Sequence, residues 1–159
     1  MNNLIELKDC ILLGSGAEGS VYLTSEGLAL KCFNNILVRD YVNGENLSNY
    51  LSKNGLSYSL SIELIDLIED LKILKFKRIN IRNAHIFINK NEKLMVIDPR
   101  KPYTKIMPYP KDIIKILLKL NLFDTFLKNL LSYRPDLLDY WIDGYNFVVN
   151  NYRHVLRYG

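Results

Sequence analysis

The stretch that decides the fold is Leu13-Gly14-Ser15-Gly16-Ala17-Glu18-Gly19-Ser20-Val21-Tyr22. It contains a full G-x-G-x-x-G-x-V pattern between two apolar runs. The lack of side chains at Gly14, Gly16 and Gly19 would let the backbone close over phosphate groups. Val21 offers an apolar lid for a flat base, and Lys31, in the next apolar run, offers a positive charge for phosphate oxygens. The stretch therefore predicts a nucleotide site.

The same three glycines occur in dinucleotide-binding loops, but the residues after them favour a different topology. A dinucleotide-binding loop opens a helix inside a βαβ unit. Here a second β-type run (20–23) follows directly, and residues 24–27 then have the composition of a turn. We therefore expect a β-hairpin that covers ligand phosphates as a flap. A β-turn rich in small residues is the alternative.

Composition and charge are those of an ordinary globular protein. The chain has 159 residues, enough for one domain or for two small lobes that share a cleft. Hydrophobic residues make up 48% of it, and the net charge of +4 comes from scattered basic residues, which do not indicate nucleic acid as a partner. No apolar run approaches the ~18 residues of a membrane span, and residues 1–6 lack a basic leader. We therefore expect a cytoplasmic protein without a membrane partner.

Apolar periodicity divides the chain into a β-rich first part and a helical second part. Strands are predicted over 10–13, 20–23, 28–33 and 36–42. A short helix then ends at Asn54-Gly55, a longer one begins near Ser57 or Ser59, and a hairpin pairs 86–88 with 94–97. Helices follow from Lys111, with a break at 132–134 and a last helix starting at Pro135.

Several later segments give the chain a specific resemblance. Residues 39–47 resemble the hinge of the protein-kinase-like superfamily, and residues 79–88 resemble its pattern R-D-L-K-x-x-N-I-x-I. Asp98, after an apolar strand, resembles the aspartate of D-F-G, and Asp112 resembles the aspartate that anchors the catalytic loop. The similarity covers roughly residues 10–120. The chain is thus similar to a minimal, bacterial-type Ser/Thr kinase.

The resemblance implies an α+β protein with a bilobal fold. It places a small antiparallel β N-lobe at 1–42, a hinge at 43–47 and a mainly helical C-lobe with a short hairpin at 48–159, all in one minimal domain. Backbone groups of Asp40 and Val42 would bind the adenine edge, and Ala29 would lie beside the nucleotide.

The resemblance also implies a set of catalytic positions. ATP with Mg²⁺ or Mn²⁺ would be the cofactor, with Lys31 and Arg82 on the phosphates, Asp98 and His85 on the metal, and Asn80 at the position of the base. Each of these residues has a simpler explanation. Asp98 can cap a strand end, Arg82 can be a surface charge, and His85 can be a structural histidine.

Two residue types depart from the family pattern. At Asn80, an amide cannot take up a proton at neutral pH, although it can orient a hydroxyl. At His85, an imidazole prefers softer metals than magnesium, and Asn83 is an alternative ligand two residues away.

A whole helix of the family is missing as well. Only Asn34 and Asn35 separate the third and fourth strands, so the regulatory helix and its glutamate do not fit there. Lys31 would then need another partner, from Glu6, Glu18, Asp98 or a second protein.

These observations leave three hypotheses. The first is a minimal kinase that transfers the γ-phosphoryl group of ATP to a Ser/Thr or other hydroxyl of a protein or a small molecule. The second is a pseudokinase, a nucleotide-binding regulatory scaffold for a partner protein. The third is a helical module that binds a partner through its apolar C-terminal helices, most of whose apolar residues we assign to the core.

Overall fold

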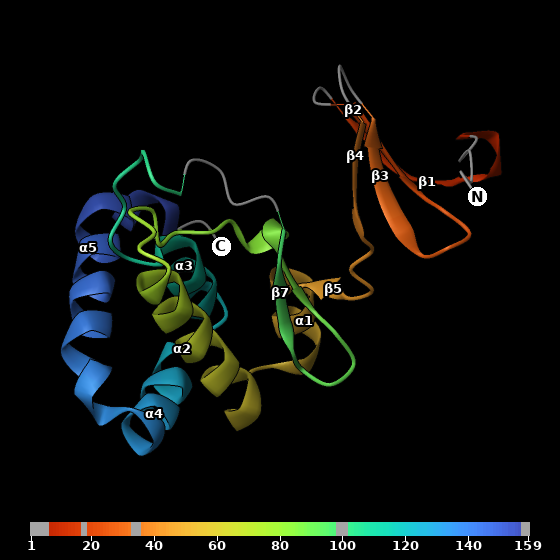
Figure 1. The fold of residues 1–159 in the computed structure, drawn as a ribbon. Helices are drawn as coiled ribbons and strands as arrows, with labels where there is room; N and C mark the ends of the chain where they lie inside the picture. Colours follow the sequence, from red (N-terminus) through yellow and green to blue (C-terminus); the bar gives the residue numbers. More distant parts are fainter. Residues whose placement is uncertain (1–6, 17–18, 33–35, 98–101, 157–159) are drawn as a thin grey trace. The chain divides into compact units, whose positions relative to one another are not determined.

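The computed structural model describes residues 7–16, 19–32, 36–97 and 102–156 (Figure 1). The protein is α+β, with two small antiparallel sheets and five α-helices in these ranges. The chain divides into two compact units, residues 1–43 and residues 44–159.

The first unit is a four-stranded antiparallel sheet in the order β1-β2-β3-β4. Its strands are β1 (Ile11–Gly16), β2 (Gly19–Leu23), β3 (Leu28–Cys32) and β4 (Ile36–Asp40). The turn between β2 and β3 forms as expected. The Thr24 hydroxyl accepts the N–H of Leu28 at 3.0 Å, and Gly27 adopts a φ of 79°.

The glycine pattern lies mostly within strands, where the sequence alone predicts a loop. β1 continues to Gly16, which pairs with Gly19, so only residues 17 and 18 remain between the two strands. A register shift between Leu12 and Gly14 bends β1 just before the tip. The predicted hairpin is therefore confirmed, with a shorter connection.

The second unit begins with a small sheet and two capped helices. Its three strands, in the order β5-β6-β7, are β5 (Glu45–Asn46), β6 (Ile86–Ile88) and β7 (Leu94–Val96). The side chain of Asn46 caps α1 (Leu47–Asn54), and the Ser57 hydroxyl caps α2 (Tyr58–Ile73). β5 was not predicted, since Glu-Asn has no strand pattern.

Glu92, in the turn of the β6–β7 hairpin, binds both of these helices. Its carboxylate accepts hydrogen bonds from the Tyr50 hydroxyl at 3.0 Å and the Ser57 hydroxyl at 2.8 Å. The hairpin is thereby held to the middle of α1 and the start of α2. Burial, and then this bond to Glu92, raise the pKa of Tyr50.

The remaining helices complete the second unit. They are α3 (Lys111–Lys119), α4 (Phe123–Tyr133) and α5 (Leu138–Leu156), with a 3-10 turn, η3 (Pro135–Leu137), before α5. α4 extends through Tyr133, so the break predicted at 132–134 narrows to Arg134. α3 packs against α5, and α2 packs against α4.

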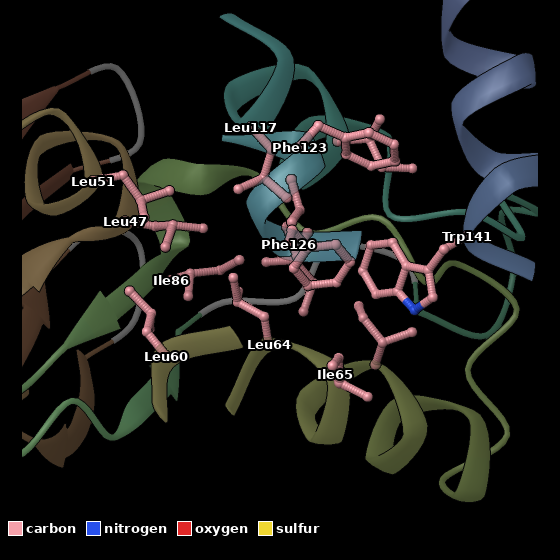
Figure 2. Close-up of a cluster of buried hydrophobic side chains, with 14 of the residues drawn as sticks. Leu47, Leu51, Leu60, Leu64, Ile65, Ile86, Leu117, Phe123, Phe126 and Trp141 are labelled. Atoms are coloured by element: carbon pink, nitrogen blue, oxygen red, sulfur yellow. The ribbon is translucent and has the colours of Figure 1, made fainter. Parts of the chain in front are cut away.

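A single apolar core joins these helices to the β6–β7 hairpin (Figure 2). Leu60, Leu64 and Ile65 of α2 and Phe126 of α4 are fully buried in it, together with Trp141 of α5. The rings of Phe126 and Trp141 lie 4.5 Å apart. The helix α5 approaches closely enough that a Cβ at Gly144 would lie 2.8 Å from Ile114 Cδ1, which explains a glycine within a helix.

Within the described ranges, no helix combines the length and apolar character that a membrane span requires.

Candidate functional site

In the first unit, the strand register brings together four of the residues predicted to bind a nucleotide. Gly14 of β1 lies opposite Val21 of β2, and Val21 lies opposite Lys31 of β3. Directly opposed residues of antiparallel strands project from the same face, and so do residues two apart on one strand. Val21, Lys31 and Ala29 therefore share one face of the sheet, beside Gly14.

The fold itself does not require glycine at two of the three pattern positions. A Cβ added at Gly14 or at Gly16 would have no atom of the described structure within 4 Å, and neither residue has a positive φ. Gly19, in contrast, has a φ of 102°, a conformation that other residues rarely adopt. Only Gly19 is thus explained by its own backbone.

The predicted hinge lies at the boundary of the two units. Asp40 is the last residue of β4, and Val42 lies in the irregular segment that follows. Gly44, two residues after Val42, lies directly against β6. A Cβ at Gly44 would be 2.5 Å from the carbonyl oxygen of Ile88. The start of the second unit is therefore tied to its sheet before β5 begins.

In the second unit, Asn80 is bonded to the first turn of α3. Its Oδ1 accepts the backbone N–H of Asp112 at 2.7 Å, and its Nδ2 donates to Asp112 Oδ2 at 2.9 Å. Asn80 is only 3% exposed. Because the first N–H groups of a helix lack partners within the helix, Asn80 serves as a distant N-terminal cap for α3. This pair joins the segment that contains Asn80 to the start of α3.

Asn83 makes a second link to the same residue. Its Nδ2 donates to the carbonyl oxygen of Asp112 at 2.9 Å, whereas its Oδ1 is buried and accepts no hydrogen bond in the described structure. That oxygen is of the hard type that Mg²⁺ prefers, but the protein encloses it. As placed, Asn83 does not offer this oxygen to a metal ion.

Arg82 directly precedes the 3-10 turn η2 (Asn83–His85), and His85 is the last residue of that turn. The side chain of Arg82 is exposed, and that of His85 is partly buried. The carbonyl oxygen of His85 accepts the N–H of Ile97 at 2.9 Å, which brings the end of the β7 segment beside the predicted loop. Ile97 is the last described residue before Asp98.

The predicted metal site stays a prediction, because one of its two ligands falls outside the described ranges. No group of three or more His, Cys, Asp or Glu side chains gathers within those ranges as metal ligands. Asp98, the carboxylate of the predicted pair with His85, lies outside the described ranges. Glu6 and Glu18, two of the candidate partners for Lys31, lie outside them as well.

The sequence did not predict that the side chain of Asn80 is buried and hydrogen-bonded to Asp112. The resemblance placed both residues in one site, but the side-chain type alone does not tell which way Asn80 points.

Comparison with models of protein families gives no match for this chain, and comparison with curated proteins gives none either.

Proposed function

We propose that this chain binds a nucleoside triphosphate through its first unit and acts as a regulatory scaffold of the protein-kinase-like type. The observation that carries the proposal is the register of β1, β2 and β3, which aligns Gly14, Val21 and Lys31 across the sheet. This alignment supports an apolar surface for a base next to a cation for phosphate oxygens.

The open space around Gly14 and Gly16 supports the same proposal. A glycine that neither its backbone nor its neighbours require is explained when a ligand must approach the main chain closely. Phosphate groups that are bound by backbone N–H groups must approach the main chain in this way.

The position of Asn80 favours a scaffold over a kinase. Phosphoryl transfer needs a group that orients the attacking hydroxyl, and that group must be accessible to the acceptor. Asn80 is buried against α3 and bonded to Asp112. A minimal kinase with ATP and Mg²⁺ or Mn²⁺ is the second candidate, because Arg82 is exposed at the position of the family's catalytic-loop lysine.

Calorimetric titration of the whole chain with ATP, with and without Mg²⁺ or Mn²⁺, tests nucleotide binding. We expect binding that weakens about tenfold to a hundredfold in Lys31→Ala, since a charged hydrogen bond contributes about 1.5–3 kcal/mol. Lys128→Ala, at an exposed site on α4, is the matched control and should bind like the parent chain. Undetectable binding, or equal loss in both variants, would refute the proposal.

Gly14→Ala and Gly16→Ala make the test specific to the backbone. Both variants should retain the circular dichroism and thermal unfolding of the parent chain, because the added methyl group meets no described atom. Both should nevertheless weaken ATP binding.

Transfer of radiolabel from γ-labelled ATP separates the two candidate functions. The scaffold predicts ATP binding with no transfer to the chain itself or to a protein-substrate library above the protein-free rate. Transfer that disappears in Arg82→Ala would establish the kinase instead.

A further inference from the structure

Backbone hydrogen bonds join two segments of the second unit outside the loop discussed above. Residues 72–78 comprise the last two residues of α2 and the segment that follows it, and residues 102–107 lie between β7 and α3. The backbone N–H groups of Lys77 and Arg78 both donate to the carbonyl oxygen of Pro102, at 2.8 Å and 3.0 Å, and that of Met107 donates to Lys77 at 2.9 Å. The side chains of Phe76 and Tyr103 add an edge-to-face contact with ring centroids 5.1 Å apart.

Four large apolar residues of these segments face solvent. Ile73, Leu74, Tyr103 and Ile106 each keep between 55% and 75% of their surface exposed. A single exposed apolar side chain is ordinary, but several on two joined segments indicate a surface that another molecule covers.

The charges of the same segments all have one sign. Together they contain five basic residues and no Asp or Glu, the basic ones being Lys72, Lys75, Lys77, Arg78 and Lys105. Lys75, Lys77 and Lys105 are exposed. We call Ile73, Leu74, Lys75, Lys77, Tyr103, Lys105 and Ile106 the basic-apolar face.

Lys75 holds a position where glycine would be more stable. The N–H of Lys75 donates to the Lys72 carbonyl and that of Phe76 to the Leu71 carbonyl, the bonding pattern that commonly ends a helix with a left-handed residue. Lys75 has a φ of 57°, which destabilises a residue with a side chain relative to glycine. A lysine at this strained, exposed position, in place of glycine, is explained if its positive charge binds another molecule.

We propose that the basic-apolar face binds an acidic segment of a partner protein that also carries apolar side chains. The complementarity is direct: carboxylates meet the lysines, and apolar side chains cover Ile73, Leu74 and Ile106. The two segments are shorter than the roughly 20–30 residues that each side of a standard interface uses, so the surface suits a short peptide segment.

An anionic membrane would meet the same lysines, but it fits the surroundings less well. Asp70 is exposed and lies one helical turn before Leu74, whose N–H donates to its carbonyl. A flat anionic surface covering Leu74 would also face this carboxylate, whereas a discrete segment can leave it in water.

This inference does not depend on nucleotide binding, because no residue of the face belongs to the first unit. Lys31→Ala should therefore bind the same peptides as the parent chain, which keeps the two proposals separable.

The test is selection of random peptides displayed on phage against the whole chain, followed by anisotropy titration of the selected peptides labelled with fluorescein. We expect the selected sequences to be enriched in Asp and Glu together with Leu, Ile or Phe. The triple variant Lys75→Glu/Lys77→Glu/Lys105→Glu should weaken their binding at least tenfold.

A matched variant controls for net charge. Lys90→Glu/Lys119→Glu/Lys128→Glu makes the same charge change at exposed lysines outside the face and should leave the affinity unchanged. Ile73→Ser/Ile106→Ser, which keeps all lysines, should weaken binding by removing the apolar part. Circular dichroism of each variant verifies that the helices remain.

Three results would overturn the proposal: no peptide selected, selected peptides without acidic enrichment, or equal loss of affinity in both triple variants. Vesicles of phosphatidylserine and phosphatidylcholine form a separate arm. Vesicle binding that the face variant alone abolishes, without peptide binding, would assign the face to a membrane and equally refute the protein partner.

Discussion

Three of the described non-glycine residues of the second unit, Lys75, Glu92 and Asn121, take left-handed backbone, and the surroundings of the first two differ. Glu92 has a φ of 58°, and its carboxylate is used by the hydroxyls of Tyr50 and Ser57. Its strain is thus offset by hydrogen bonds that join three elements. The side chain of Lys75 is exposed instead. The left-handed backbone of Lys75 serves to end α2. The two positions therefore respond differently to glycine.

Lys75→Gly should stabilise the protein by about 1 kcal/mol, because glycine adopts the left-handed region without a steric penalty. Urea unfolding, followed by the fluorescence of the single tryptophan, Trp141, measures the change. Lys77→Gly is the control, since Lys77 has no positive φ and glycine there adds only chain entropy to the unfolded state. A midpoint that falls in Lys75→Gly would show that the lysine side chain itself stabilises the fold.

Between elements, hydrogen bonds from Asn80 join the 78–85 segment to the start of α3. Asn80 and Asp112 exchange two hydrogen bonds: the Asn80 amide nitrogen donates to the Asp112 carboxylate, and the Asp112 backbone N–H donates to the Asn80 amide oxygen. The geometry therefore tolerates only one negative charge, since a second carboxylate would lie directly against the first.

Asn80→Asp, which would bring residues 79–88 closer to the kinase pattern that they resemble, should consequently destabilise the second unit by about 1–3 kcal/mol at neutral pH. The exchange Asn80→Asp/Asp112→Asn should restore most of that stability. In the exchanged pair the new carboxylate accepts both the side-chain amide and the backbone N–H of residue 112. Urea midpoints of the two variants check this. Stable, active Asn80→Asp would instead indicate that the residue faces an acceptor.

The sequence predicted elements better than it predicted contacts between them. Alternation and turn residues place β1 to β4, and helical periodicity with caps such as Ser57 places α1 to α5, because local backbone preferences decide these. β5 escaped prediction, since the pairing of Glu45 and Asn46 with β6 depends on the close approach of Gly44 to Ile88.

The candidate site was predictable only in part. The resemblance indicated Asp112 as an anchor, but which atoms of Asn80 it binds depends on the path of the loop. The basic-apolar face had no sequence signal, because Ile73 and Leu74 continue the apolar pattern of α2 past the point where the core ends.

For the molecule as a whole, the partly buried Tyr140 links stability to alkaline pH. Tyr140 donates to the Pro108 carbonyl at 2.7 Å, and the Lys72 ammonium lies 3.3 Å from its ring centroid. Burial, followed by the nearby Glu69 carboxylate, raises the pKa of Tyr140 well above its usual range. The folded chain therefore retains this proton at a pH where the unfolded chain has released it.

The free energy of unfolding should fall as pH rises above the ordinary tyrosine pKa of about 10, because the unfolded state binds fewer protons there. Below that pH, Tyr140 does not make the free energy of unfolding depend on pH. Tyr140→Phe keeps the ring but removes the proton, so its stability should decline less steeply between neutral and strongly alkaline pH. Tyr103→Phe, at an exposed ring, should follow the parent chain, and equal slopes in all three would exclude Tyr140 as the source.

The empty space beside Gly14 and Gly16 also has an evolutionary consequence. In a saturation library sorted only for folded, protease-resistant chains, small residues should accumulate at both positions, while Gly44, where a Cβ would meet the backbone of Ile88, should remain glycine. A second sort then selects chains that still bind the ligand. If the same small residues are lost in that sort, ligand binding rather than folding requires glycine at these positions.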